Sequence, residues 1–195
     1  ITDQGLRVLG WREVPTDSSV CGAIALSSLP VIEQVFVDAS GVSEQELSTK
    51  LFVARRKAEI ANADDPGFYI VSLSGRVIAY KGLVMPVDLP RFYLDLDDER
   101  LETAICVFHQ RFSTNTFPTW DLAQPFRFLC HNGEINTLRG NINWMNARQA
   151  LFDTDLFGAD LPKLFPIATP GASDSAILDN ALELLYHTGR SLPHA

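Results

Sequence analysis

Apolar and polar residues alternate in two stretches near the start of the chain, residues 6–14 and 31–37, and this period of two predicts β-strands. A helical period follows, because apolar residues recur at steps of three and four after Ser43. Ser43 and Glu46 also form the S-x-x-E pattern of a capping box, in which each side chain binds the backbone N–H of the other residue. We therefore expect a long helix that begins at Ser43 and ends at the turn residues 64–67. Its apolar stripe comprises Leu47, Leu51, Ala54, Ala58 and Ala61.

Further strands are predicted in the middle of the chain. Residues 68–73 and 76–81 are separated by Ser-Gly, which predicts a β-hairpin. Two more apolar runs predict strands over residues 103–109 and 126–130.

Helical periods return near the end of the chain and predict helices over residues 138–152 and 173–186. The strands occur mostly as antiparallel hairpins and the helices in blocks, so the pattern indicates an α+β fold rather than alternating βαβ units. No repeat or linker divides the sequence, and we expect residues 1–195 to belong to a single domain. One face of the last helix is expected to carry Ile177, Ala181, Leu184 and Leu185.

The composition is that of a folded protein with an excess of acidic residues. Hydrophobic residues make up 46% of the chain, which excludes intrinsic disorder as its main state. The net charge of −8 argues against nucleic acid or an anionic membrane as a partner. The one basic run, Arg55-Arg56-Lys57, is expected on the solvated face of a helix. No apolar stretch reaches the roughly 18 residues that cross a bilayer, so no membrane association is expected.

The three cysteines are too few for a disulfide framework and favour a reducing compartment, so we expect a cytoplasmic protein. Cys106 with His109, and Cys130 with His131, resemble parts of a zinc site. If both segments are strands, however, the members of each pair point to opposite faces of a sheet. Such side chains cannot converge on a tetrahedral zinc ion, and no metal site is expected.

A polar segment follows the predicted strand 103–109. It begins at Arg111 and continues with hydroxyl and amide side chains, Thr114 among them. An arginine at the end of a strand can bind a carboxylate through two parallel hydrogen bonds. An ordinary ion pair at the surface is the alternative interpretation.

A second polar segment, His131-Asn132-Gly133-Glu134, follows the predicted strand 126–130. Asn-Gly is a common dipeptide of tight turns, which is a sufficient structural explanation. The side-chain amide of Asn132 and the backbone N–H of Gly133 can also donate two hydrogen bonds to a developing oxyanion. On this segment alone both interpretations stay open.

Before the last helix, Ser173 has the position of an N-cap and Asp174 the position of an acidic residue in the first turn. Capping explains both residues structurally. Alternatively, the Asp174 carboxylate receives the ammonium group of an amino acid. Together with Arg111 and the Asn-Gly pair, it would form a site for an amino acid that has a reactive side-chain carbonyl.

Longer stretches of the sequence resemble a known family. The most specific is residues 109–148, which contain HNGEINTLRGN, and residues 171–185 (GASDSAILDNALELL), 189–195 (GRSLPHA) and 67–83 (GFYIVSLSGRVIAYKGL) extend the match. These segments resemble the class II glutamine amidotransferase domain of glutamate synthase large subunits. The resemblance covers most of the chain.

The resemblance implies an N-terminal-nucleophile hydrolase with αββα layers that hydrolyses glutamine to glutamate and ammonia, the ammonia then making glutamate from 2-oxoglutarate. It implies that Arg111 binds the α-carboxylate of glutamine and Asp174 its α-ammonium group. Asn132 and Gly133 would form the oxyanion hole, and Thr114 would line the pocket. FMN and an iron–sulfur cluster are implied for the remaining domains of such a protein, and no cofactor is implied for this segment.

The family's nucleophile is an N-terminal cysteine, and the chain begins with Ile1 instead. We therefore expect an internal segment of the glutaminase domain that lacks its nucleophile and is inactive alone. Cys21-Gly22 resembles such a start, but the family's nucleophile lies further upstream of the Arg111 motif. Two alternatives remain: a non-catalytic amino-acid-binding module, and a self-processed hydrolase that uses Cys21.

Overall fold

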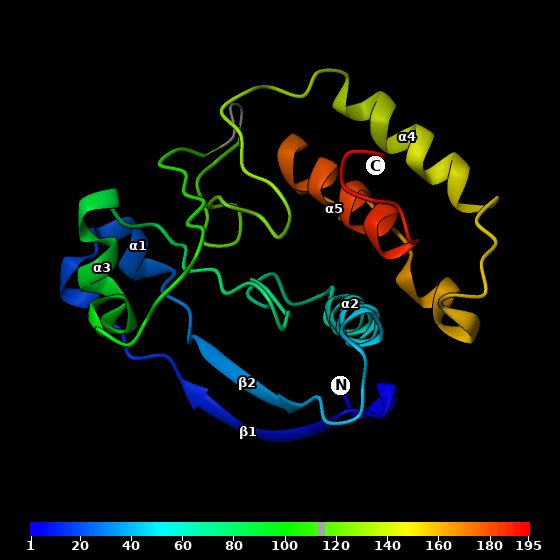
Figure 1. Ribbon diagram of the computed structural model, residues 1–195. Helices are drawn as coiled ribbons and strands as arrows, with labels where there is room; N and C mark the ends of the chain where they lie inside the picture. Colours follow the sequence, from blue (N-terminus) through cyan, green and yellow to red (C-terminus); the bar gives the residue numbers. More distant parts are fainter. Residues whose placement is uncertain (113–115) are drawn as a thin grey trace.

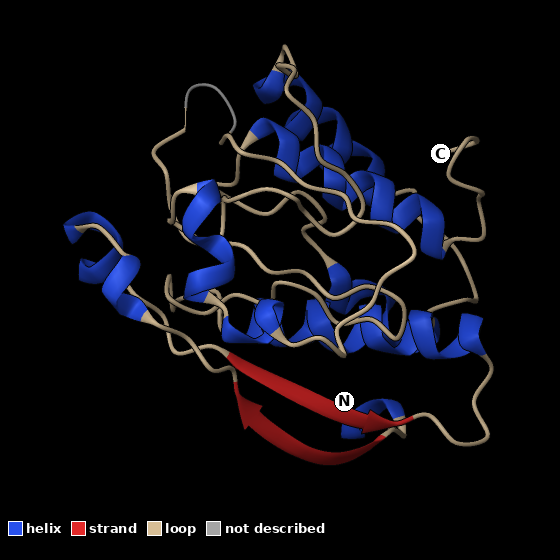
Figure 2. Cartoon of the chain, turned by 60° about the vertical axis from the view of Figure 1, so that its left-hand side comes forward, coloured by secondary structure: helices blue, strands red, loops and turns tan. Residues whose placement is uncertain are grey.

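The computed structural model describes residues 1–112 and 116–195, and its elements form layers (Figures 1 and 2). The hairpin of β1 and β2 lies on one side, α2 lies next to it, and α5 and α4 lie on the far side of α2. The strands are β1 (Arg7–Glu13) and β2 (Glu33–Asp38), and the helices are α1 (Ala23–Ser27), α2 (Glu44–Ala61), α3 (Leu89–Phe92), α4 (Leu138–Gln149) and α5 (Asp174–His187). Short 3-10 turns are η1 (Thr2–Gln4), η2 (Ser18–Val20), η3 (Pro86–Asp88), η4 (Leu94–Asp97) and η5 (Gly158–Leu164).

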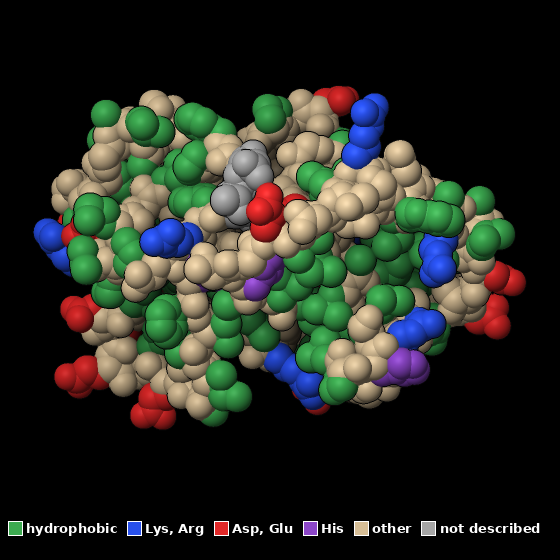
Figure 3. Space-filling model, turned by 90° about the horizontal axis from the view of Figure 1, so that it is seen from above, with side chains coloured by type: hydrophobic (Ala, Val, Ile, Leu, Met, Phe, Trp, Pro, Cys, Tyr) green, Lys and Arg blue, Asp and Glu red, His purple; other side chains and the backbone are tan. Residues whose placement is uncertain are grey.

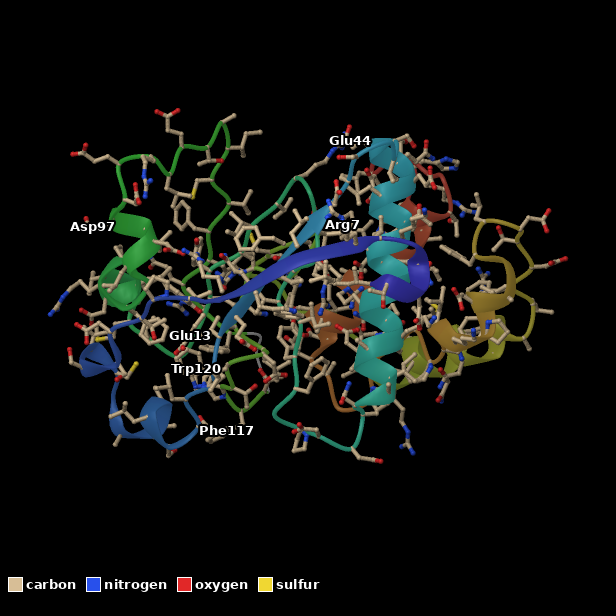
Figure 4. All side chains as sticks on the ribbon, turned by 90° about the horizontal axis from the view of Figure 1, so that it is seen from below. Arg7, Glu13, Glu44, Asp97, Phe117 and Trp120 are labelled. Atoms are coloured by element: carbon tan, nitrogen blue, oxygen red, sulfur yellow. The ribbon has the colours of Figure 1, made fainter. Side chains whose placement is uncertain are left out.

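Strands β1 and β2 confirm the first two predicted strands. They pair antiparallel from Arg7 opposite Asp38 to Glu13 opposite Glu33, with an irregularity between Val8 and Gly10. Figure 4 shows β1 running from Arg7, beside α2, to Glu13. The mixture of helix and antiparallel strand confirms the α+β class. The described residues form one two-stranded sheet, without a second sheet packed on it.

Helix α2 begins as its sequence predicts, because the Ser43 side chain accepts a hydrogen bond from the backbone N–H of Glu46 at 3.3 Å. The capping box also predicts a hydrogen bond from the Ser43 N–H to the Glu46 side chain. The Glu46 carboxylate instead contacts Lys50 Nζ at 2.9 Å. The middle of the helix is buried from Leu51 to Arg56, on more sides than the predicted apolar stripe.

The basic run on α2 was wrongly predicted to be solvated. Arg55 is 1% exposed, and its guanidinium contacts Glu59 Oε2 at 2.6 Å and the carboxylate of Glu183 on α5. Arg56 is buried as well and donates to the backbone carbonyls of Leu164 and Pro166. These side chains are buried because carboxylates and carbonyl oxygens inside the molecule compensate their charge, a pattern that sequence periodicity does not reveal.

Two clusters of buried apolar side chains form the core. The first packs α2 and α5 against η5, and the second packs α1 against α3 and the end of β1. Figure 1 shows these two groups of elements at opposite sides of the molecule. The first cluster contains Phe52, Val53, Phe157, Leu164, Ile167 and Leu184, and the second contains Val14, Cys21, Ala25, Phe92 and Tyr93.

The predicted hairpin over 68–81 and the predicted strand over 103–109 are wrong, because neither segment is in a strand. The chain does turn where predicted, since Ser74 Oγ accepts hydrogen bonds from the N–H groups of Arg76 and Val77. The two arms nevertheless form no ladder. In the second segment Ile105 is 78% exposed, so its apolar run packs on no core among the described residues.

The helices predicted near the end of the chain are confirmed as α4 and α5. Seen from above, hydrophobic side chains gather over the middle of the surface and charged side chains lie mostly around its rim (Figure 3). None of the helices described is both long enough and apolar enough to cross a membrane.

Candidate functional site

A cavity of about 570 Å³ lies where three segments meet: the loop after the undescribed residues 113–115, the segment that leads into α4, and the start of α5. This volume is within the usual range for small-molecule sites. Phe117, on the first of these segments, is labelled with Trp120 in Figure 4. The described lining residues are Thr116, Phe117, Thr119, Leu122, Glu134, Ile135, Asn136, Thr137, Leu138, Gly171, Ala172, Ser173 and Asp174.

Asp174 provides a buried carboxylate on the wall of this cavity. Ser173 caps α5 as predicted, because its hydroxyl accepts the N–H of Ala176 at 3.2 Å. Asp174 follows in the first turn and is 7% exposed. Its Oδ1 accepts from the backbone N–H of Ser175 at 2.6 Å, and its Oδ2 accepts from the N–H of Ile135 at 2.8 Å. The carboxylate therefore joins α5 to the segment that follows the Asn-Gly pair.

The predicted strand 126–130 is instead a loop that is bound by a side chain. The carboxylate of Asp179, on α5, accepts hydrogen bonds from the N–H groups of Arg127, Phe128 and Leu129 at 3.2, 2.8 and 3.0 Å. In a sheet, N–H groups of such a segment would bind a neighbouring strand. Burial raises the pKa of Asp179, and the N–H of Phe128 opposes that shift.

The Asn-Gly pair lies in a turn that is held by His131. The Gly133 N–H donates to His131 Nδ1 at 3.0 Å. Gln124 fixes the same histidine, since its side chain donates to the His131 carbonyl and accepts from the His131 N–H, at 3.2 and 3.0 Å. Asn132 and Gly133 are both exposed. The turn interpretation is therefore correct, and the oxyanion role stays a prediction.

Arg111 has the same local geometry as Gly133. Its backbone N–H donates to His109 Nδ1 at 2.9 Å, and its side chain is exposed. The Nε2 atoms of His109 and His131 are both buried without a hydrogen-bond partner within the described part of the chain. Thr114, the predicted pocket residue, lies outside the described residues.

The structure brings together only part of the predicted site. Asp174 lines the cavity, whereas Arg111, Asn132 and Gly133 are not among its described lining residues. The last two directly precede Glu134, which does line it, and Arg111 precedes the segment that continues to Thr116. The predicted residues are thus close in sequence to residues that line the cavity.

The cysteines and histidines do not form a metal site among the described residues, where no group of three or more metal-binding side chains was found. Cys106 and Cys130 are not in strands, so the argument from opposite sheet faces does not apply to them. Cys21 is buried in the second core cluster, and burial raises the pKa of its thiol. Its backbone N–H donates to the carbonyl of Ser18.

The sequence profile of the family described as Glutamine amidotransferases class-II matches residues 1–195. The chain belongs to the class-II glutamine amidotransferases. It is 49% identical to the "Glutamate synthase [NADPH] large chain" of Bacillus subtilis, over 100% of this chain and 13% of that protein. It is 50% identical to "Ferredoxin-dependent glutamate synthase 2" of Synechocystis, over 95% of this chain and 12% of that protein. It is 45% identical to "Glutamate synthase [NADH]" of Saccharomyces cerevisiae, over 97% and 9%. The chain thus spans about an eighth or less of these relatives.

Two residues on the cavity wall of this amidotransferase chain, Thr119 and Thr137, have features that its sequence does not indicate. Thr119 lines the cavity, and its hydroxyl oxygen is buried without a hydrogen-bond partner among the residues described. Thr137, also on the wall, has φ of 61°, a left-handed conformation that β-branched residues rarely adopt. Backbone strain of this kind collects at functional sites. Neither a lone hydroxyl nor a strained threonine has a pattern in the sequence that distinguishes it from its neighbours.

Proposed function

We propose that the chain is the glutamine-binding part of the glutaminase domain of a glutamate synthase. The observation that carries the proposal is the buried Asp174 carboxylate on the wall of a ligand-sized cavity. Asp174 Oδ1 accepts from the N–H and the hydroxyl of Ser175, and Oδ2 accepts from the N–H of Ile135. These bonds preorganise the carboxylate and leave acceptor capacity on Oδ2 for a cation. The hydroxyl of Thr119, which has no hydrogen-bond partner among the described residues, offers a further polar contact from another wall.

In this proposal each remaining residue has one task. Asp174 accepts the α-ammonium group of glutamine and Arg111 binds its α-carboxylate, with Thr114 lining the pocket. The Asn132 amide and the Gly133 N–H stabilise the oxyanion that forms on the side-chain carbonyl. The Gly133 N–H must first leave His131 Nδ1, which it contacts at 3.0 Å.

The larger setting is also part of the proposal. The αββα layers would belong to the whole glutaminase domain, and the nucleophilic cysteine to a part of that domain outside this chain. The ammonia would be used to make glutamate from 2-oxoglutarate by the remaining domains, in the cytoplasm. FMN and the iron–sulfur cluster, which the resemblance implies for the parent protein, would belong to those other domains as well.

The Asp174 role is tested by removing one charge from the ligand and one from the protein. Asp174→Asn is expected to weaken the binding of L-glutamine, measured by calorimetry, at least tenfold. A hydrogen bond between charged groups contributes about 1.5–3 kcal/mol. Glutaramate has no α-amino group, and its affinity is expected to change less than about threefold.

Two further variants make this experiment selective. Arg111→Met is expected to weaken the binding of both L-glutamine and glutaramate, since both have the carboxylate that Arg111 is proposed to bind. Asp153→Asn, at an exposed position, should change neither. If Asp174→Asn weakens glutaramate as much as glutamine, or leaves both unchanged, Asp174 does not bind the ammonium group and the proposal is wrong.

A further inference from the structure

The loop that contains the Asn-Gly pair, residues 127–135, is attached to α5 at both ends. At its start, three successive N–H groups donate to Asp179 at 2.8 to 3.2 Å. At its end, the N–H of Ile135 donates to Asp174 at 2.8 Å. The two carboxylates are five residues apart on one helix, about 7.5 Å along its axis.

Further hydrogen bonds hold the middle of the loop, where the Asn-Gly pair lies. The Gln124 side chain makes two hydrogen bonds to the backbone of His131. The His131 ring in turn accepts the N–H of Gly133. The loop is therefore held at its start, middle and end by three side chains: Asp179, Gln124 and Asp174.

Helix α5 is itself a fixed reference for the loop. Leu184 of α5 belongs to the same buried apolar cluster as Phe52 and Val53 of α2. Arg127, at the start of the loop, contacts Glu59 of α2 at 2.6 Å and also donates to the carbonyl of Ile70. Asp179 is 1% exposed, so no solvent competes for its oxygens. The packing fixes the helix to α2, whereas the Arg127 contacts hold only a side chain of the loop and Asp179 holds its backbone N–H groups, so a change at Asp179 moves the loop backbone and not the helix.

We infer that Asp179 is a positioning residue for glutamine hydrolysis: it holds the 127–135 loop so that Asn132 and Gly133 face the carbonyl of a glutamine bound at Asp174. This inference rests on the proposed function. A carboxylate suits the task because its two oxygens accept all three N–H groups. An asparagine has the same shape but would direct an NH2 group at one of these donors, so the loop start would shift.

The test uses the complete glutamate synthase that contains this chain and measures glutaminase kcat and KM separately. Asp179→Asn is expected to lower kcat about 100-fold, because a misplacement of about 1 Å at the reacting centre has an effect of this size. KM for glutamine should change less than about threefold, since Asp174 and Arg111 are intact. Asp174→Asn should instead raise KM.

Glu183→Gln is the matched control, because it removes another buried carboxylate of the same helix that does not contact the loop. It is expected to lower stability while kcat and KM stay within about threefold. Gln124→Met is a second test, because Gln124 lies just before the loop and holds the His131 backbone in its middle. It should lower kcat like Asp179→Asn, so the inference stays testable if the Asp179 variant fails to fold.

The loop itself can be followed by NMR in the 195-residue chain. Asp179→Asn should shift the amide signal of Gly133 as well as those of residues 127–129, whereas Glu183→Gln should not shift Gly133. If Asp174→Asn raises KM but Asp179→Asn and Gln124→Met leave kcat unchanged, the inference is wrong and the proposed function stands. If neither aspartate affects the glutaminase reaction, the proposed function is wrong. An equal rise in KM for both aspartate variants contradicts a separate positioning role.

Discussion

His187, in the last turn of α5, is buried against Phe52 of α2, and the two ring centroids are 4.5 Å apart. Burial lowers the pKa of His187 to about 4; Glu183 opposes this shift and Arg55 adds to it. The imidazole is therefore neutral at physiological pH, when it packs as an aromatic ring. Protonation would place a cation against the Phe52 ring and within the electrostatic reach of Arg55.

We expect the free energy of unfolding to fall as the pH is lowered from about 6.5 toward 4. In this window the unfolded chain binds a proton at His187 and the folded chain does not, so acid favours unfolding. One such group contributes at most about 1.4 kcal/mol per pH unit. Urea denaturation between pH 4 and 7 measures the slope. His187→Phe should reduce it, whereas His194→Gln, at an exposed position, should not; equal slopes for wild type and His187→Phe contradict this prediction.

Among single residues, the sequence predicted those whose role follows from local chemistry. Ser173 and Asp174 have the pattern of a helix start, and the structure confirms both the cap and a buried carboxylate on a cavity. Asp179 binds a loop some 50 residues earlier in the chain, and a contact of that range leaves no periodic signal. Arg111 and the Asn-Gly pair were recognised through resemblance, and their roles await the experiments above.

At the scale of elements, the helices were predicted better than the strands. Helices α2 and α5 have capping residues, so each start is specified locally. A strand depends on a neighbour, and only the first two predicted strands have one. The segment 126–130 has the composition of a strand but gives its N–H groups to Asp179. Sequence patterns cannot distinguish these two uses of the same backbone groups.

Buried ion pairs join α2 to α5, and no pattern in the sequence indicated that they are buried. Arg55 contacts both Glu59 and Glu183. Burial alone would raise the pKa of Glu59, but Arg55, Arg127 and Arg56 outweigh it and lower the pKa. The Glu59 carboxylate therefore stays charged.

Arg55→Met is expected to destabilise the chain by about 3–5 kcal/mol, because it removes the cation that the buried Glu183 carboxylate contacts. Arg7→Met is the matched control. Arg7 also contacts a carboxylate at 2.6 Å, that of Asp38, but its side chain is 73% exposed, so the expected loss is at most about 1 kcal/mol. Urea denaturation measures both values. Similar losses for the two variants would show that burial does not set the strength of this ion pair.

At the scale of the whole molecule, the main question is where the nucleophile lies. The alternative of a self-sufficient hydrolase requires Cys21 to be a reactive N-terminal residue. The structure places its thiol in a core cluster beside Phe92 and Tyr93, with a raised pKa. A buried thiol of this kind is a poor nucleophile.

Incubation with a diazo-ketone analogue of glutamine, followed by intact mass and peptide mapping, tests this point. We expect no adduct on Cys21 in the 195-residue chain. Two controls are needed: iodoacetamide should label the exposed Cys106, and the diazo-ketone should label the complete glutamate synthase at its own nucleophile. A single adduct on Cys21 means that the chain is a hydrolase in its own right.

The buried charges have a consequence for how copies of the chain behave toward one another. The buried side chains include three that are formally cationic and three that are formally anionic: Arg55, Arg56 and Lys81, and Asp174, Asp179 and Glu183. Their charges cancel, so the net charge of −8 resides on partly and fully accessible side chains. Like-charged surfaces repel over a Debye length of about 10 Å at 0.1 M salt. We expect this colloidal repulsion to keep two copies of the chain from meeting through exposed apolar side chains such as Trp11 and Phe36. Added salt should weaken the repulsion.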